Sequence, residues 1–247
     1  NNFNNFNNMN NFNIIFIHGW LFDSRIWCNF DKLFTNNHNV KKINLPGYGD
    51  NIEKNLSNRD YCKRVFKAID SPSIIICWSY GGLLALHECA NNYPNIKKII
   101  LINSNPYIFS NTSKSFLNKN NIETLKKGLE TDRYKTIQKF FFECVKNSKF
   151  SKNEYKFLKE NFLIDSLPEN VILTEGLEYL SEPNNSKLLM EIKKDVLIIN
   201  GGNDHFIEPI LFSNKIYNNI SVEIINNMGH MPFISYKDEI YNVISDF

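Results

Sequence analysis

The chain has 247 residues, of which 43% are hydrophobic, which is enough for one large α/β domain with an inserted subdomain. Its net charge of +2 creates no strong overall field, so neither a nucleic acid nor a membrane is expected as a partner. The five scattered cysteines include no C-x-x-C pair, which argues against a disulfide framework and a zinc site. No apolar run of about 18 residues and no basic-then-apolar leader is present, so we expect a cytoplasmic monomer without a membrane span.

Residues 1–13 are of low complexity, dominated by asparagine, and are expected to add little to a core. The apolar run at residues 14–17 predicts a central parallel strand that is buried on both faces. It leads into His18-Gly19-Trp20, where the glycine would let the backbone curl and aim the amide of Trp20 at the space above the sheet. A plain strand-ending turn with a core tryptophan is the alternative.

Three further elements are predicted before the next informative stretch. Apolar spacing indicates a helix over residues 22–34, with its aromatic side chains in the core. Residues 40–45 are expected to form a strand and residues 46–49 a turn, because proline fixes φ and glycine permits positive φ. A modest helix is expected over residues 61–69.

A serine lies on a predicted strand-to-helix bend. The β-branched run at residues 74–76 predicts a buried strand and residues 81–90 predict a helix, so Ser79 falls between them. Such a tight bend needs small residues two positions before and after the serine; Gly81 fits, whereas Cys77 stands where glycine is more common. The first amides of the helix would face the same point as the hydroxyl. The alternative is an ordinary bend with an incidental serine.

After a strand predicted at residues 97–102, the alternation of strands and helices stops. Four helices are expected without an intervening strand, at residues 116–129, 133–145, 152–162 and 169–180. We interpret residues 108–186 as a helical lid inserted into a core made of residues 1–107 and 187–247. Beyond it we expect strands at 195–200 and 221–225 and a closing helix at 238–247.

The predicted lid carries a concentration of positive charge. Residues 133–159 include eight basic and two acidic residues. Two pairs of lysines are spaced i,i+4, so that like charges repel on one helix face by about 0.2–0.5 kcal/mol per pair: Lys135 with Lys139, and Lys152 with Lys156. Such a surface suits an acidic docking partner, and a solvated lysine-rich face is the alternative.

Two polar residues follow late strands. The turn at residues 201–204 would deliver Asp204 to the sheet edge that holds Ser79, and His230 lies on a loop after the last strand. A serine hydroxyl needs a neutral imidazole as its base, and that imidazole needs a carboxylate to fix its tautomer. The chain order serine, aspartate, histidine is that of the α/β-hydrolases. No cluster has metal-ligand spacing and no glycine-rich phosphate loop follows the first strand, so neither a metal nor a cofactor is expected.

Five blocks together resemble those of the pimeloyl-[acyl-carrier-protein] methyl ester esterases of biotin synthesis, within the α/β-hydrolases. They are HGW at 18–20, LPGYG at 45–49, CWSYGGLLA at 77–85, YKTIQKFF at 134–141 and GHMPFIS at 229–235. The resemblance spans nearly the whole chain after residue 13. It implies a mostly parallel sheet flanked by helices, with an inserted helical lid. Departures from the family pattern are Cys77 for glycine, Asn44 for aspartate, and lysine for arginine in the lid.

The resemblance also implies roles for individual residues. The catalytic triad would be Ser79, Asp204 and His230, with the oxyanion held by the amides of Trp20 and Tyr80. The acyl chain would contact Trp20, Phe140, Phe141 and Cys144. The two lysine pairs of the lid would engage the acidic carrier protein, although lysine lacks the bidentate geometry of arginine.

The implied reaction is hydrolysis of the methyl ester at the far end of a carrier-bound pimeloyl chain. Two alternatives stay open: a broad short-chain carboxylesterase, and a hydrolase-fold binding protein without catalysis. Comparing p-nitrophenyl esters of different chain length with the carrier-bound ester distinguishes the broad carboxylesterase from the pimeloyl ester esterase. Absence of labelling of Ser79 by a fluorophosphonate would favour the binding protein.

Overall fold

The computed structural model describes residues 12–106, 116–182, 187–209 and 218–247. Its centre is a six-stranded, fully parallel sheet in the order β2-β1-β3-β4-β5-β6. The strands are β1 (Asn13–Ile17), β2 (Asn39–Ile43), β3 (Ser73–Trp78), β4 (Ile96–Ile102), β5 (Asp195–Gly201) and β6 (Ile220–Ile225). The inner strands β1, β3, β4 and β5 are buried over most of their length, which explains the apolar runs that they contain in the sequence.

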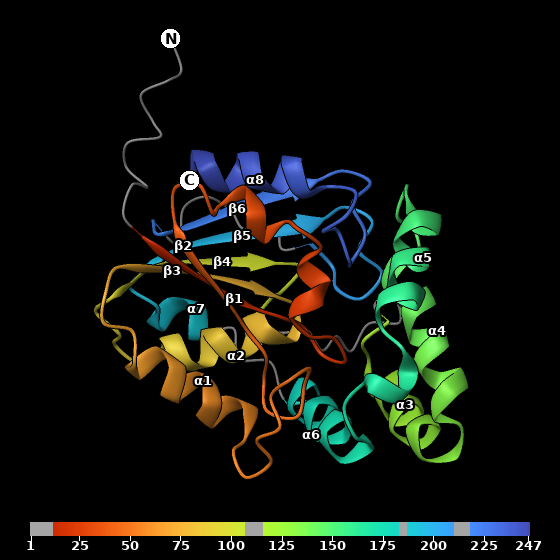
Figure 1. Ribbon diagram of the computed structural model, residues 1–247. Helices are drawn as coiled ribbons and strands as arrows, with labels where there is room; N and C mark the ends of the chain where they lie inside the picture. The colour runs from red at the N-terminus through yellow and green to blue at the C-terminus, as the bar shows by residue number, and fades with distance from the viewer. Residues whose placement is uncertain (1–11, 107–115, 183–186, 210–217) are drawn as a thin grey trace.

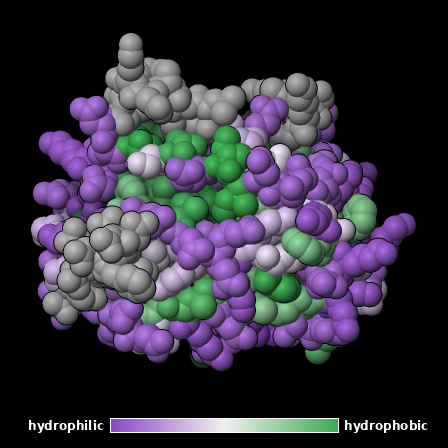
Figure 2. Space-filling view, turned by 90° about the horizontal axis from the view of Figure 1, so that it is seen from above, coloured by the Kyte–Doolittle hydropathy of each residue, from purple (hydrophilic) through white to green (hydrophobic). Residues whose placement is uncertain are grey.

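Helices cover both faces of the sheet (Figure 1). Helices α1 (Asn58–Lys67), α2 (Tyr80–Cys89) and α7 (Lys187–Glu191) lie on one face, and α8 (Lys237–Asp246) lies on the other. Helix α8 buries Ile240 and Ile244 and leaves its other side to solvent. Seen from above, the surface on this side is mostly hydrophilic, with apolar residues gathered near its centre (Figure 2). In the described part of the chain, every helix is too short or too polar to cross a membrane.

The four helices expected without an intervening strand are present: α3 (Lys119–Thr131), α4 (Arg133–Val145), α5 (Ser151–Asn161) and α6 (Asn170–Leu180). They lie beyond the carboxyl ends of the strands (Figure 1). Local capping sets two of the starts: the side chain of Asn118 accepts from the amide of Asn121, and that of Asp132 accepts from the amide of Lys135. Both ends of the predicted lid, residues 107–115 and 183–186, fall outside the described residues.

The prediction of a helix over residues 22–34 is wrong. Two short 3-10 turns, Ser24–Trp27 and Asp31–Leu33, take its place. Between them Cys28 and Asn29 have φ values of 45° and 68°, and a left-handed backbone cannot continue a right-handed helix. The predicted burial of the aromatic side chains in this segment is nevertheless confirmed for Trp27, Phe30 and Phe34.

Smaller differences concern the ends of elements. Helix α1 begins at Asn58 rather than at residue 61, because the hydroxyl of Ser57 accepts from the amide of Asp60 and caps the first turn. Strand β2 ends at Ile43, two residues before the predicted end. Helix α7 was not predicted, since its five residues are too few to show a periodic pattern.

The strand order places a crevice beside the bend that carries Ser79. The chain passes from β1 outward to β2 and then returns to β3 on the other side of β1, so the order reverses between β1 and β3. Loops that leave neighbouring strands in opposite directions open a crevice at their carboxyl ends, where open α/β sheets bind ligands. Gly19 follows β1 and Ser79 directly follows β3, so both lie at this point.

Candidate active site

Ser79 stands on a strained backbone between β3 and α2. Its φ of 51° and ψ of −119° lie in a region that L-residues avoid, at a cost of about 1–3 kcal/mol. Two contacts hold this bend: the hydroxyl of Ser104 donates to the carbonyl of Ser79 at 2.6 Å, and Gly81 lets α2 approach the end of β1. A Cβ on Gly81 would lie 2.3 Å from the carbonyl oxygen of His18, so a larger residue is excluded there. The bend therefore presents the serine side chain at the crevice.

His230 joins Ser79 to Asp204. Its Nε2 lies 3.0 Å from Ser79 Oγ, and its Nδ1 lies 2.8 Å from Asp204 Oδ2. A carboxylate can only accept, so Nδ1 carries the proton and Nε2 offers a lone pair to the serine hydroxyl. The structure thus brings together three side chains that the sequence places 125 and 26 positions apart. This is the protonation pattern that a general base for serine requires.

The carboxylate of Asp204 is held on both oxygens. Oδ2 faces His230, while Oδ1 accepts from the amide of Phe206 at 2.7 Å and lies 3.3 Å from the amide of Ile207. Its side chain is fully buried. Because both oxygens are bonded, the carboxylate cannot rotate away from the imidazole without losing these bonds.

The loop of His230 is fixed by two residues that were not singled out in the sequence. Trp78 Nε1 donates to the carbonyl of His230 at 2.8 Å. Asn103 Nδ2 donates to the carbonyls of Gly229 and His230, at 2.8 and 3.0 Å, and Asn103 Oδ1 accepts from the amide of Gly201. Asn103 has a φ of 46° and directly follows β4. An asparagine immediately after a buried strand was the one available signal, since asparagine tolerates this conformation.

His18 controls the peptide that carries the Trp20 amide. His18 Nε2 accepts from the amide of Leu45 at 3.0 Å, so Nδ1 holds the proton and donates to the carbonyl of Gly19 at 2.8 Å. In a trans peptide, the Trp20 N–H points opposite to that carbonyl, away from His18. Burial lowers the pKa of His18 to about 4, which keeps the ring neutral. His18 therefore orients the amide of Trp20.

The second predicted amide donor, that of Tyr80, occupies the first position of α2. An amide in the first turn of a helix has no partner four residues earlier and points outward from the helix end. Its neighbours Gly82 and Leu83 already turn their amides to the carbonyl of Ser79. Because Tyr80 directly follows Ser79, its amide lies at the positive end of the α2 dipole, which favours a negative charge that develops beside the serine.

An apolar cavity adjoins Ser79 and His230. It is narrow, with a volume of about 10 Å³ open to the centre of a water molecule, and its other described lining residues are Trp20, Phe22, Trp78, Leu117, Phe140, Cys144, Leu180 and Phe206. No charged side chain is among these described residues. The cavity thus suits a neutral hydrocarbon chain that ends at the serine.

Phe141 differs from the other expected contacts with an acyl chain. Phe140 and Cys144 line the cavity because they are one helical turn apart on α4. Phe141 is rotated by about 100° from Phe140 on a helix and instead stacks on the ring of Phe22, with centroids 5.6 Å apart. It therefore supports the wall of the cavity from behind.

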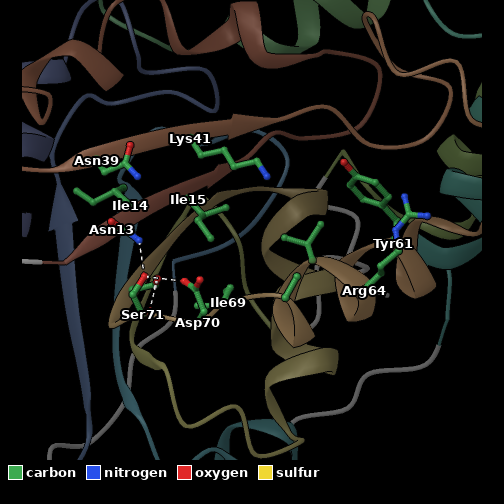
Figure 3. Close-up of a pocket in the computed structure, with 13 residues that line it drawn as sticks. Asn13, Ile14, Ile15, Asn39, Lys41, Tyr61, Arg64, Ile69, Asp70 and Ser71 are labelled. Atoms are coloured by element: carbon green, nitrogen blue, oxygen red, sulfur yellow. Dashed lines mark hydrogen bonds between the residues drawn. The ribbon is translucent and has the colours of Figure 1, made fainter.

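A second cavity lies at the amino ends of the strands, far from these residues (Figure 3). Asn13, Asn39, Tyr61, Arg64 and Asp70 are among its lining residues. It contains no serine–histidine pair among its described residues, and Arg64 is already paired with Glu53. The serine–histidine chemistry described above is therefore not repeated among the described residues of this cavity.

The four lysines predicted as a docking surface are all exposed. Lys135 and Lys139 lie on α4, and Lys152 and Lys156 lie on α5; we call these four residues the lysine face. Within the described residues, Lys156 is paired with Glu160 at 3.8 Å, whereas no ion pair is seen for the other three. Phe142, 51% exposed on the same stretch of α4, contacts the ring of Tyr155 on α5. The helices of the lysine face thus also carry an exposed Phe142 in contact with a half-buried Tyr155, a pair that the sequence analysis did not identify.

His205 links the loop of Asp204 to helix α4. Its Nε2 lies 2.8 Å from Glu143 Oε2. Burial first, and the positive charge of Lys146 second, lower the pKa of His205, so the ring is neutral at pH 7. The contact is then a close approach of a neutral ring to the carboxylate rather than an ion pair. No local pattern in the sequence indicates this contact, because Glu143 and His205 are 62 positions apart.

A strained serine after a parallel strand, with an acid and a histidine after later strands in that chain order, defines the α/β-hydrolase class. The sequence agrees: residues 14–243 match the family model described as "Alpha/beta hydrolase family". The chain belongs to this family.

Two curated relatives within this family carry the same name. The "Pimeloyl-[acyl-carrier protein] methyl ester esterase" of Wigglesworthia glossinidia brevipalpis is 29% identical over 240 residues, which cover 95% of this chain and 93% of that one. The protein of the same name from Shewanella woodyi is 26% identical, with 95% and 93% covered.

Solved structures share the fold. An esterase from Exiguobacterium antarcticum superposes with a TM-score of 0.79 at 16% identity, covering 96% of this chain and 91% of that one. MenH from S. aureus superposes with a TM-score of 0.72 at 20% identity, with 94% and 91% covered.

Proposed function

We propose that this protein is a serine carboxylesterase that hydrolyses the methyl ester of pimeloyl-[acyl-carrier protein], producing pimeloyl-[acyl-carrier protein] and methanol for biotin synthesis. The observation that carries the proposal is the continuous chain from Ser79 Oγ through His230 to Asp204, opening into an apolar cavity. The curated relatives, which match over almost their whole length, supply the substrate class.

In the acylation step, Ser79 Oγ attacks the ester carbonyl while His230 Nε2 removes its proton. The carboxylate of Asp204 stabilises the imidazolium that forms. The amides of Trp20 and Tyr80 donate to the oxygen of the tetrahedral intermediate. When the intermediate collapses, the carbon–oxygen bond to the methoxy group breaks, and methanol leaves with the proton from His230.

In the deacylation step, water takes the place of methanol. His230 Nε2 removes a proton from the water as its oxygen attacks the acyl-serine carbonyl. Collapse of the second intermediate returns the proton to Ser79 Oγ and releases the free carboxylate.

The apolar cavity supports an uncharged acyl chain as the substrate. A methyl ester and the methylene groups beside it carry no charge, so Phe140, Cys144 and Leu180 can contact them without leaving a buried polar group unpaired. We propose that the insertion that contributes these residues acts as a lid, residues 108–186, on a core formed by residues 1–107 and 187–247.

The lysine face supports an acidic protein as the carrier of the substrate. Four exposed ammonium groups on the helices that carry the pair Phe142 and Tyr155 combine charge attraction with an apolar contact. We propose that the acyl carrier protein docks there and that the enzyme acts as a monomer in the cytoplasm, where the free thiols of its cysteines persist.

The direct test is hydrolysis of purified pimeloyl-[acyl-carrier protein] methyl ester, followed by the mass of the carrier protein and by methanol release. We expect activity in the wild type, none above background in Ser79→Ala, and full activity in Ser166→Ala, which changes an exposed serine. The same three proteins should behave alike in restoring growth without biotin to a strain that lacks this esterase. A Ser79→Ala protein that still hydrolyses the ester would contradict the proposal.

A further inference from the structure

The indole of Trp20 is held by a helix of the insertion. Trp20 Nε1 donates to the carbonyl of Leu173 in α6 at 2.9 Å, and the side chain of Trp20 is almost fully buried. Helix α6, drawn in teal at the foot of the insertion in Figure 1, is separated from Trp20 by about 150 positions in the sequence. A buried N–H that loses its acceptor costs about 1–3 kcal/mol, so the indole is anchored to α6.

Gly176 permits this close approach. A Cβ at Gly176 would lie 2.5 Å from Cδ1 of Trp20 and 2.9 Å from its Nε1, which is closer than non-bonded atoms allow. Glycine within a helix costs about 0.5–1 kcal/mol relative to alanine. Gly176 lies in the middle of α6. It has the lowest helix propensity of the residues in α6, yet it is the residue that makes room for the indole.

The same tryptophan is held on its other side by the core. His18 fixes the Gly19 carbonyl, and thereby the plane of the peptide that includes the Trp20 N–H. The ring of Phe140 on α4 meets the indole edge-on, with centroids 4.8 Å apart. Trp20 is thus held from two sides, at the Gly19–Trp20 peptide by the core and at the indole by the insertion, so both contacts act on the position of its amide.

We infer that helix α6 positions the Trp20 amide in the oxyanion hole, through the hydrogen bond of the indole to Leu173 and the fit of the indole against Gly176. Trp20 and Gly176 are positioning residues in this respect. The inference rests on the proposed function, in which the Trp20 amide stabilises the oxyanion. Its consequence is that the oxyanion hole is complete only when α6 is packed against Trp20.

Two variants test it, Gly176→Ala and Trp20→Phe. The first forces the indole to shift, and the second removes the N–H donor but keeps an aromatic side chain and the backbone amide. The control is Gly128→Ala in α3, where a Cβ would meet Thr136 at 2.4 Å, a similarly tight contact within the insertion but away from the cavity. The readouts are kcat and KM for p-nitrophenyl butyrate, the inhibition constant of an alkyl trifluoromethyl ketone, and thermal unfolding. That ketone forms a tetrahedral adduct with the serine, so its affinity reports on the oxyanion hole.

Deleting one oxyanion donor lowers kcat roughly 10²–10³-fold, so an amide that is displaced but still present should lower it about tenfold. We expect this loss in both variants, with KM changed less than twofold, ketone affinity reduced in parallel with kcat, and wild-type kinetics in Gly128→Ala. The double variant should lose no more kcat than the more impaired of the two single variants, because both changes act on one contact.

Three results would overturn the inference. They are unchanged kcat and ketone affinity in folded Gly176→Ala and Trp20→Phe proteins, a rise in KM alone, and an equal loss in Gly128→Ala. A rise in KM alone would mean that the indole only lines the cavity. Failure of the proposed function is distinguishable, since it would appear as hydrolysis that persists in Ser79→Ala.

Discussion

Replacing Asp204 by asparagine should remove the general base without disturbing the fold. In the wild type, Oδ1 accepts from two backbone amides and Oδ2 accepts from His230 Nδ1. The carbonyl oxygen of an asparagine has to occupy the Oδ1 position, because an NH₂ group there would face the N–H groups of Phe206 and Ile207. The NH₂ group then points at His230 Nδ1. The imidazole is forced into the tautomer with its proton on Nε2, which cannot accept the proton of Ser79.

The expected loss follows from this change of tautomer. The equivalent change in serine proteases lowers kcat about 10⁴-fold, which corresponds to about 5 kcal/mol of transition-state stabilisation. We expect a loss of that size in kcat for p-nitrophenyl butyrate, with KM and the urea midpoint of unfolding close to wild type. Asp195→Asn, which changes an exposed aspartate at the start of β5, is the matched control and should be fully active. An Asp204→Asn enzyme within tenfold of the wild-type kcat would refute the assigned tautomer.

Three further predictions concern other parts of the molecule. Changing all four residues of the lysine face to glutamate should raise KM for the carrier-bound ester at least tenfold and leave kcat/KM for p-nitrophenyl butyrate unchanged; equal rates on the carrier-bound ester would contradict carrier docking there. Cys144→Phe should fill the cavity, so that hydrolysis of p-nitrophenyl octanoate falls more than that of p-nitrophenyl acetate, and a uniform loss would speak against the cavity as the acyl site. His18 has a pKa of about 4 in the folded state, below its value of about 6.5 when unfolded, so its contribution is complete above pH 6.5 and is lost as the pH falls towards 4. Urea unfolding at pH 7.5 and 4.5 should show a loss that is smaller by about 2–3 kcal/mol in His18→Gln than in the wild type, and identical losses would contradict a buried neutral ring.

The residues of the candidate site that could be predicted from the sequence share one property: each lies on the segment that leaves the carboxyl end of a strand. Ser79 ends an apolar run, Asp204 ends a tight turn after another, and His230 follows the last strand. Parallel strands bring such positions to one edge without any knowledge of long-range contacts. The helices of the insertion were predictable for a similar reason, because periodicity and capping residues are local signals.

The parts that were missed depend on contacts between distant segments or on single backbone conformations. Cys28 and Asn29 break the predicted helix, yet the apolar spacing around them is helical. The bonds of Asn103 to the His230 loop, and of Trp20 to Leu173, join residues more than 120 positions apart. No local pattern announces such a partner, and only the packed structure identifies it.

The measurement that bears most directly on the catalytic assignment is the capture of the acyl-enzyme. The enzyme would be mixed with carrier-bound pimeloyl methyl ester, quenched in acid within milliseconds, digested and mapped by mass spectrometry. We expect methanol to be released in a burst that does not exceed the enzyme concentration, together with a pimeloyl ester on the peptide that contains Ser79. Hydrolysis without an acylated Ser79 peptide, or with the acyl group on a different residue, would contradict the assignment.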